Sequence, residues 1–450
     1  MKTKITLKNL LFVVVLFSFA CSSKQDKDKI KSSSSDEKVN ESERIFDVNL
    51  IDNLGNTTDA FYLSEIADSI ELVQLEMKAN HLFVEENMQN LLFVDDNIFF
   101  YEDKAGLLKY SRTGKFEQQI GKIGRGPGEY MLIRNFYIDE DRKTITGYLN
   151  WTGKLVTYDL DGKLIEETTP PECFGIKEYS RFYRFGNYYL AEHSPTFSDE
   201  TKDTSQIFNF AVTDSLFNEV ETLTDPNYIA RKQEILENKY DPWDSWANFY
   251  QIKPPKMKFR NKYLDYLYSG SDTIYRLTEK LHNVVRYVLN SGDKMPFEMR
   301  HCRLPPLKYF DFVVVTGFEE TAAYLFIDLA HEKNFYKARF RKSDGITDML
   351  KTKCEIQENF LSGKLYNRRR NGEKPVFTND IIGTGAFEPT FTTEKTWTST
   401  VPAYQLMRLN LDSLSQIEVK HPVARDNLIK MIENMKETDG PILMIAHLKM

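Results

Sequence analysis

The chain has 450 residues, of which 28% are charged, and its formal net charge is −7 at pH 7. An acidic chain argues against nucleic acid as a partner, because nucleic-acid recognition requires a basic stripe or patch. We therefore expect no nucleic-acid partner. The chain is also too long for a single β-sandwich.

The cysteines and histidines give no sign of a metal site or a disulfide framework. Cys21, Cys173, Cys302 and Cys354 show no CxxC spacing, and the last three permit one disulfide at most, so we expect them to be buried or free. None of the seven histidines shows HxH or HExxH spacing. The sequence indicates no metal and names no cofactor.

Residues 1–20 have the layout of a secretory signal peptide. Three lysines precede an apolar run from Leu10 to Phe17, and the small residue Ala20 ends the segment. The run is too short to span a bilayer, which requires roughly 20 apolar residues. Removal of these 20 residues, which contain three lysines and no acidic residue, leaves the mature chain at −10.

Cys21 follows this cleavage position directly, which is typical of a lipoprotein processing site. The usual pattern prefers Leu three residues earlier, where this chain has Ser18, so cleavage without lipidation is the alternative. Residues 21–43 are mostly Ser, Lys, Asp, Glu, Gln and Asn, a composition that predicts a disordered tether. We therefore expect a lipid anchor at Cys21 in the outer membrane, facing the periplasm or the outside.

Residues 44–450 are predicted to form an all-β domain. Short apolar alternations separated by Gly, Asp and Asn turns run through this segment, and aromatic residues reach 13% of the chain. At about 40–50 residues per four-stranded blade, the length fits a six-bladed β-propeller with short helical or loop insertions.

An internal repeat supports the propeller. Residues 107–116 (LLKYSRTGKF) match residues 154–164 (KLVTYDLDGKL) at an offset of 48 residues. Each copy predicts two strands joined by a tight Thr-Gly or Asp-Gly turn. Apolar strands at 97–101 and 144–148 precede the two copies, which gives about four strands per period.

Weaker copies predict the remaining blades. The predicted strands and turns are 188–190, 207–212 and 214–218 for the third blade, 263–268, 273–277 and 284–289 for the fourth, 312–315, 324–329 and 335–340 for the fifth, and 375–378, 381–382 and 404–409 for the sixth. Residues 228–258 and 351–373 are predicted to be helical or loop insertions.

The two ends of the domain are predicted to close the ring. Residues 427–435 have helical spacing, and the chain finishes on an apolar strand at 441–448. That strand would pair with a strand at 70–75, which removes the exposed edges of an open sheet.

Four ordered segments carry a family resemblance. They are IGKIGRGPGEY (120–130), LSEIADSIELVQLE (63–76), SDTIYRL (271–277) and GPILMIAHLK (440–449). Together they resemble a family of six-bladed propeller lipoproteins of Bacteroides-like bacteria that is distantly related to NHL repeats. The resemblance implies fold and location; it implies no activity and no catalytic residues.

The glycine-rich string 121–128 could be a phosphate cradle, but the residues after it are typical of a strand, whereas a dinucleotide-binding loop requires a helix there. We therefore interpret it as a tight crossing between blades. Arg125 and Glu129 could contact a ligand at the channel mouth, or could tie neighbouring blades together by ion pairing, which is the interpretation we favour.

A second candidate site is the aromatic insertion DPWDSWANFY, which contains Trp243, Trp246 and Tyr250. Flat apolar faces with interleaved Asp and Asn suit a sugar or peptide, although the same residues could simply pack the insertion onto the propeller. The basic run 368–370 could meet an anionic group, and a solvated loop is the interpretation that we prefer for it.

The leading functional hypothesis is a non-catalytic binding or scaffold protein of the cell envelope, with a glycan, a peptide or an envelope protein as ligand. The alternative is a propeller enzyme of the lyase, lactonase or glycosidase type with a polar or metal site at the channel. No GxSxG motif is present, and a catalytic carboxylate pair cannot be chosen among 66 acidic residues. A third hypothesis, an assembly partner, predicts a flat apolar patch.

Overall fold

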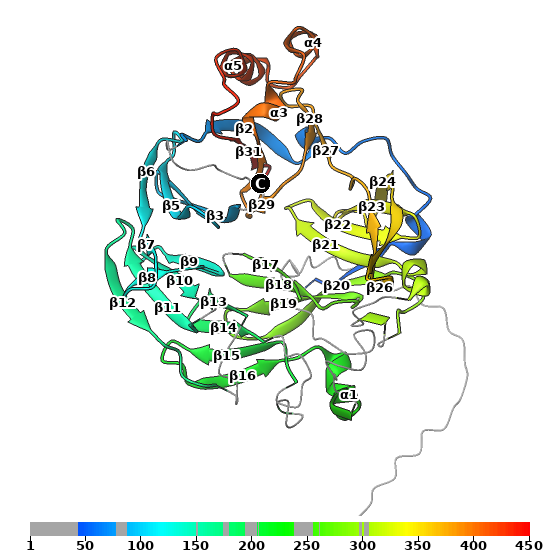
Figure 1. Ribbon diagram of the computed structural model, residues 1–450. Coiled ribbons are helices and arrows are strands. Elements are labelled where there is room, and N and C mark those ends of the chain that lie inside the picture. The colour runs from blue at the N-terminus through cyan, green and yellow to red at the C-terminus, as the bar shows by residue number, and fades with distance from the viewer. Residues whose placement is uncertain are drawn as a thin grey trace, which may run out of the picture. The chain divides into compact units, whose positions relative to one another are not determined.

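The computed structural model describes residues 44–77, 88–149, 152–173, 180–193, 205, 207–260 without 238–254, 262–296, 299–300 and 306–450. Six sheets of four or five strands surround a common centre, as Figure 1 shows. The prediction of an all-β, six-bladed propeller is therefore confirmed. Within the described residues, no helix is long and apolar enough to cross a membrane.

The first three blades are antiparallel meanders in chain order. Blade 1 contains β3 (Met88–Val94), β4 (Asn97–Glu102), β5 (Gly106–Ser111) and β6 (Phe116–Ile120). Blade 2 contains β9 (Asn135–Asp139), β10 (Thr144–Leu149), β11 (Lys154–Asp159) and β12 (Leu164–Thr168). Blade 3 contains β13 (Arg181–Phe185), β14 (Tyr188–Glu192), β15 (Phe210–Asp214) and β16 (Glu219–Leu223).

The hairpin repeat has the predicted turns. Gly114 and Gly162 have φ values of +84° and +81° between β5 and β6 and between β11 and β12, respectively. These backbone conformations favour glycine, because a Cβ atom makes positive φ costly.

Blades 4 and 5 confirm the strands predicted for them and add strands at their edges. Blade 4 contains β17 (Lys256–Phe259), β18 (Tyr263–Leu267), β19 (Thr273–Thr278) and β20 (Asn283–Asn290), and β1 (Phe46–Asn49) joins it in parallel to β20. Blade 5 contains β21 (Val314–Glu320), β22 (Tyr324–His331), β23 (Asn334–Arg341) and β24 (Thr347–Lys353).

Blade 6 closes the ring with strands from both ends of the domain. It contains β29 (Phe391–Thr392), β30 (Thr396–Val401), β31 (Ile442–Leu448) and β2 (Ala67–Gln74). The antiparallel pairing of β31 with β2 confirms the predicted closure. Because the outermost strand comes from near the start of the domain, opening the ring requires this pairing to break.

The strands predicted for blade 6 were wrong. Residues 377–379 form β27 (Phe377–Asn379), which pairs with β28 (Gly385–Phe387) in a separate sheet. Residues 404–406 belong to α3 (Ala403–Leu406), whose buried residues Ala403 and Leu406 lie three apart, as a helix requires. Two more helices, α4 (Leu411–Gln416) and α5 (Pro422–Glu433), follow before β31. The last of them confirms the helix predicted near residue 427.

The two predicted insertions also differ from expectation. Residues 355–371 form a hairpin of β25 (Glu355–Leu361) and β26 (Lys364–Asn371), because Ser362 and Gly363 adopt the positive φ values of a tight turn. The other insertion begins with α1 (Pro226–Glu237), but its last residues form β17, the innermost strand of blade 4.

A separate hydrophobic cluster lies at each boundary between blades. The boundary of blades 1 and 2 contains Tyr101, Tyr130 and Tyr158, and that of blades 5 and 6 contains Phe326 and Trp397. The cluster at the boundary of blades 2 and 3 contains Tyr148, Phe182 and Phe208. The core is therefore a ring of interblade layers, and any space between two blades is lined by side chains of both.

Candidate functional site

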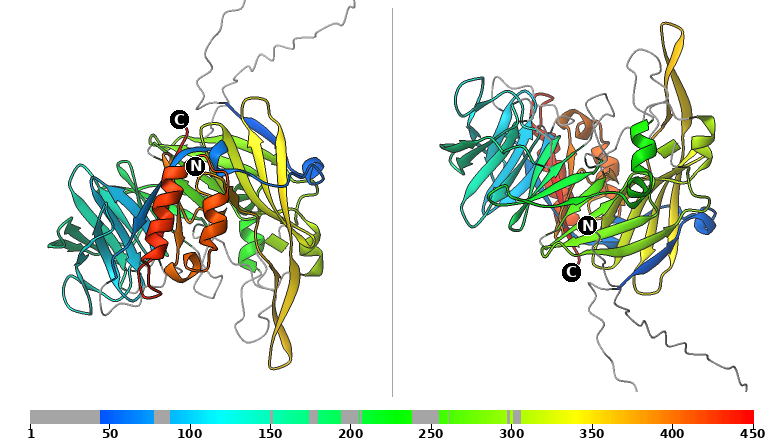
Figure 2. Two further views of the ribbon diagram at one scale, coloured as in Figure 1. Left: turned by 90° about the horizontal axis from the view of Figure 1, so that it is seen from above. Right: turned by 90° about the horizontal axis from the view of Figure 1, so that it is seen from below.

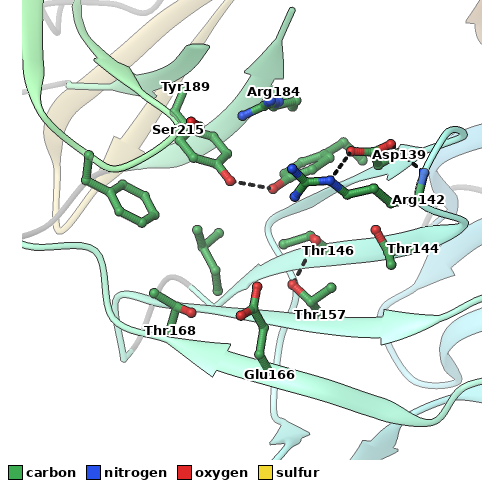
Figure 3. A pocket seen from close by; sticks show the side chains of 13 residues that line it. Asp139, Arg142, Thr144, Thr146, Thr157, Glu166, Thr168, Arg184, Tyr189 and Ser215 are labelled. Atoms are coloured by element: carbon green, nitrogen blue, oxygen red, sulfur yellow. Dashed lines mark hydrogen bonds and ion pairs between the residues drawn. The ribbon is translucent and has the colours of Figure 1, made fainter. Parts of the chain in front are cut away.

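A polar pocket of about 220 Å³ lies between blades 2 and 3. Figure 3 shows its lining, which comes from four strands of blade 2, from β13 and β14, and from the turn after β15. This volume is below the range of roughly 300–1,000 Å³ that is usual for drug-sized ligands. The pocket therefore fits a small ligand, of about the size of one sugar ring.

Blade 2 supplies a wall of hydroxyl groups. Thr144 and Thr146 are two residues apart on β10, so their side chains point to the same face of the sheet. Thr157, which is directly opposite Thr146 on β11, shares a hydrogen bond of 2.9 Å with it. These three threonines make this wall of the pocket polar.

Blade 3 supplies a rigid aromatic wall. The ring of Tyr189 stacks on Phe217 with centroids 5.1 Å apart, and the guanidinium of Arg184 lies 5.0 Å from the Tyr189 centroid. The Tyr137 hydroxyl of blade 2 donates a hydrogen bond of 3.4 Å to the Tyr189 hydroxyl. Burial, and then the neighbouring Tyr189, raise the pKa of Tyr137, so its hydroxyl remains protonated.

The charged side chains of the lining balance one another. Arg142 Nε lies 3.8 Å from Asp139 Oδ2, and Arg184 and Glu166 are the other charged residues in the lining. Two guanidinium groups and two carboxylates leave the wall without net charge. A neutral ligand with many hydroxyl groups suits such a wall better than an ionic one, because both donors and acceptors are available.

The site contains no arrangement with an assigned catalytic role. Within the described ranges, no group of three or more His, Cys, Asp or Glu side chains could hold a metal ion. The described thiols, Cys173 and Cys354, are buried, and burial raises the pKa of both. What this arrangement can do chemically is donate and accept hydrogen bonds to a small polar molecule.

Arg125 and Glu129 do not lie in this pocket. Their loop connects β6 to β9 and contains β7 (Lys122–Ile123) and β8 (Glu129–Tyr130), which pair in parallel. It packs against the outer strands of blade 2, since the Tyr158 hydroxyl donates to Gly128 O at 2.8 Å. This position is on the outer side of the ring, away from the channel mouth.

The same loop confirms that its glycines serve the crossing between blades. A Cβ atom on Gly121, whose φ is +65°, would lie 2.6 Å from the Tyr158 ring. Glu129 accepts a hydrogen bond from Gly126 N at 2.8 Å. Among the described residues neither Arg125 nor Glu129 forms an ion pair, so the ion pairing favoured from the sequence is absent there.

The other predicted candidates lie elsewhere. Trp243, Trp246, Tyr250 and Cys21 are outside the described residues. The basic run 368–370 lies in strand β26 rather than in a solvated loop. There Arg368 Nε donates to Glu358 at 2.8 Å, and Arg370 Nε donates to Glu332 O at 2.9 Å.

Sequence reasoning missed the pocket, although it carries a weak signal. Thr144 and Thr146 stand two residues apart in one predicted strand, and Thr157 lies in the next, so the sequence itself places several hydroxyl groups on strand faces. The contributions of Arg184 and Tyr189 could not be anticipated, because they lie some forty residues later in the chain and in the next blade.

Comparison with known proteins identifies the family. The pattern of the family described as a domain of unknown function, DUF4934, matches residues 45–447. The chain belongs to the DUF4934 family. This confirms the resemblance drawn from the sequence to a propeller family without an established activity.

Two solved structures are similar to this DUF4934 member. A protein of Bacteroides fragilis, described as a candidate exported protein, has 16% identity and a TM-score of 0.58, over 90% of this chain and 100% of that one. A DUF4221 family member from Bacteroides vulgatus has 11% identity and a TM-score of 0.41, over 64% of this chain and 88% of that one. At 16% identity, the likeness to the Bacteroides fragilis protein shows the fold alone. A search among curated proteins found no match.

Proposed function

We propose that this DUF4934 protein is an exported, lipid-anchored binding protein whose interblade pocket takes a small neutral ligand rich in hydroxyl groups, such as a monosaccharide unit of a glycan. The observation that carries the proposal is the polar recess of about 220 Å³ between blades 2 and 3. A concave site with a few fixed polar groups is the usual form of a small-ligand site.

The fixed geometry of the pocket supports binding. Arg184 is held by the Tyr189 ring, and Tyr189 is held by Phe217 on its stacked face and by Tyr137 at its hydroxyl. Side chains held in this way lose little conformational entropy when a ligand binds. The balanced charges of the lining favour a neutral ligand over an anion or a cation.

The anchor is supported by the sequence of residues 1–43 and by the description of the Bacteroides fragilis relative as a candidate exported protein. A lipid on Cys21 with a polar tether would keep the propeller at a membrane surface. Labelling of cells with a clickable palmitate analogue tests this. We expect label on the wild-type protein and none on Cys21→Ala; label on both proteins would contradict the assignment.

Binding is tested by isothermal titration of residues 44–450 with a panel of neutral monosaccharides and disaccharides. We expect at least one sugar to bind, and Arg184→Gln to weaken it tenfold or more. Arg341→Gln is the matched control, because Arg341 pairs with Asp344 in a turn of blade 5, outside the pocket. Equal affinity in Arg184→Gln and wild type, or no response to any sugar, would contradict the proposal.

A further inference from the structure

A smaller recess, of about 50 Å³, lies where blade 4 meets blade 5. Its lining comes from the β18–β19 turn, from residues that follow β20 and from the beginning of β21, and we call it the β18–β19 recess. A water molecule needs about 10–15 Å³ of such volume, so the recess has room for a ligand of roughly three to five non-hydrogen atoms.

The β18–β19 recess and the interblade pocket lie on opposite faces of the propeller. The pocket includes Arg142 of the β9–β10 turn and Ser215 of the β15–β16 turn, which are the first and third turns of their blades. The β18–β19 turn is the second turn of blade 4, and successive turns of an antiparallel meander lie at opposite edges of a blade. The β25–β26 hairpin, which follows the last strand of blade 5, projects from the same face as the recess (Figure 2). The two sites are therefore separate.

The recess is also separate from the buried ion pair at this boundary. Arg276 Nη2 lies 2.7 Å from Glu320 Oε2. Val314 is the first residue of β21 and Glu320 is the last, so the two are roughly 20 Å apart at about 3.3 Å per residue. The ion pair therefore closes one part of the boundary, and the recess lies at the other end of β21.

One part of the lining presents charged and hydroxyl groups. Lys294 and Arg300 are its cations and Asp272 is its carboxylate, which leaves one net positive charge. Asp272 accepts from Lys294 Nζ at 2.9 Å and from Thr273 Oγ1 at 3.0 Å. Burial would raise the pKa of Asp272, but these two hydrogen bonds outweigh it and lower the pKa, so the carboxylate stays ionised. Three serine hydroxyl groups complete this part, those of Ser269, Ser271 and Ser291.

Arg300 is held in place on a glycine of the β18–β19 turn. Ser271 N donates to Tyr268 O at 3.0 Å, and Gly270 between them has a φ of +70°, as in a tight turn. A Cβ atom on Gly270 would lie 2.8 Å from Arg300 Cγ, so the arginine side chain lies directly on the glycine backbone. Arg300 Nε donates to Met295 O at 2.9 Å. A guanidinium fixed in this way loses little conformational entropy when a ligand binds.

Another part of the lining is apolar. Val313 and Val315, at the beginning of β21, pack on the hydrophobic cluster between blades 4 and 5, and Met295 is buried. Inorganic phosphate or sulfate carries acceptors on every side, so some of them would face the valines without a donor, which is costly. A carboxylate with a short carbon chain avoids this cost, because its oxygens and its carbon atoms lie at opposite ends.

We propose that the β18–β19 recess binds a short aliphatic monocarboxylate of the size of acetate or propionate. Its oxygens would lie against Arg300 and the serine hydroxyl groups, and its carbon atoms against Val313 and Val315. A monoanion neutralises the one net positive charge of the lining, and the planar fork of an arginine matches a carboxylate. This site does not depend on the proposed sugar pocket.

The test is a titration of residues 44–450 with acetate and propionate at an ionic strength matched with sodium chloride, followed by saturation-transfer NMR of the ligand methyl protons. We expect both ligands to bind, and Arg300→Gln to weaken binding tenfold or more. Lys294→Gln should weaken it as well, because it removes the net positive charge. The Lys294 side chain is 77% exposed, so this variant keeps the test valid even if Arg300→Gln does not fold.

Lys280→Gln is the matched control for Lys294→Gln. Lys280 is an exposed lysine in the β19–β20 turn, at the other edge of the same blade, and its loss should leave the affinity unchanged. No saturation transfer to either ligand, or equal affinity in Lys294→Gln and wild type, would overturn the proposal. Displacement of acetate by an equal concentration of sulfate would also overturn it, because the recess would then prefer an inorganic oxyanion.

A second readout locates the ligand. In a protein with isotopically labelled valine methyl groups, propionate should shift the NMR signals of Val313 and Val315. Shifts of other valines without these two would contradict the assignment. Arg184→Gln of the interblade pocket should leave propionate binding intact, so failure of one site is distinguishable from failure of the other.

Discussion

The boundary between blades 4 and 5 and the boundary between blades 2 and 3 both bring charged side chains together, and they use them differently. In the first, Arg276 donates to Asp265 and to Glu320, and Glu320 also accepts from Tyr287 at 2.5 Å. Lys342 Nζ lies 2.7 Å from Glu320 as well. In the second, the charged groups line an open recess and keep surface available to a ligand.

The difference teaches which polar clusters hold the fold together and which can bind. Asp265, Arg276 and Glu320 are each at least nine-tenths buried, and the carboxylates meet their partners inside the protein. Such a network is closed to ligands and is sensitive to the loss of any member. The side chains at blades 2 and 3 have fewer partners, so their removal should affect binding more than folding.

The largest effect is expected for Glu320→Gln. It leaves Lys342 and Arg276 without one of their buried carboxylate charges, and breaking a buried pair in this way typically costs about 3–5 kcal/mol. Urea unfolding followed by circular dichroism measures the change. A decrease in the free energy of unfolding below 1 kcal/mol would mean that the ionic network between blades 4 and 5 does not hold the fold together.

The same carboxylate predicts how stability depends on pH. Burial alone would raise the pKa of Glu320, but Lys342 and Arg276 outweigh it and hold the pKa well below its ordinary value of 4.5. Its contribution to the free energy of unfolding is therefore complete above pH 4.5 and is lost progressively as the pH falls below that value. Unfolding curves between pH 6 and pH 3 should show a smaller decline for Glu320→Gln than for wild type; parallel declines would contradict this assignment.

Thr157→Val should have a modest effect at the other boundary. It removes the 2.9 Å hydrogen bond to Thr146, and a neutral hydrogen bond contributes about 1 kcal/mol to stability. We expect a loss of that order in unfolding experiments, together with weaker sugar binding in titrations. A loss as large as that of Glu320→Gln would show that the pocket wall is structural.

The smallest effect is expected at an exposed ion pair. Lys143, in blade 2, lies 2.9 Å from Asp95 of blade 1, and both side chains are more than half exposed. Exposed pairs of this kind contribute little. Lys143→Gln should leave the unfolding midpoint unchanged within error, which makes it a reference for the buried variants. A clear shift of the unfolding midpoint would show that ion pairs at the surface also stabilise the contact between blades.

Most strands of blades 1 to 5 could be predicted because their signals are local. The Thr-Gly and Asp-Gly turns mark the hairpins at 107–116 and 154–164, and alternation marks the strands beside them. Blade 6 failed at residues 404–409, where an apolar run of strand-like composition forms helix α3 after Pro402. In a short apolar segment, composition alone does not distinguish a strand from a helix.

The candidate sites could not be predicted in the same way. The interblade pocket joins Thr157 to Arg184 and Tyr189 across a blade boundary. Each of these residues has an ordinary sequence context. The chosen residues Arg125 and Glu129 stood out because of their glycine-rich surroundings, which serve the crossing between blades.

The sequence by itself determined most strands of blades 1 to 5, the repeated hairpins and the closure of the ring, because alternation, turn residues and an apolar last strand act locally or recur at a fixed period. Only the tertiary structure decided which polar side chains meet. Neighbouring blades bring together residues that are distant in the chain, and the partners left inside each boundary determine whether it becomes a closed ionic network or a recess open to a ligand.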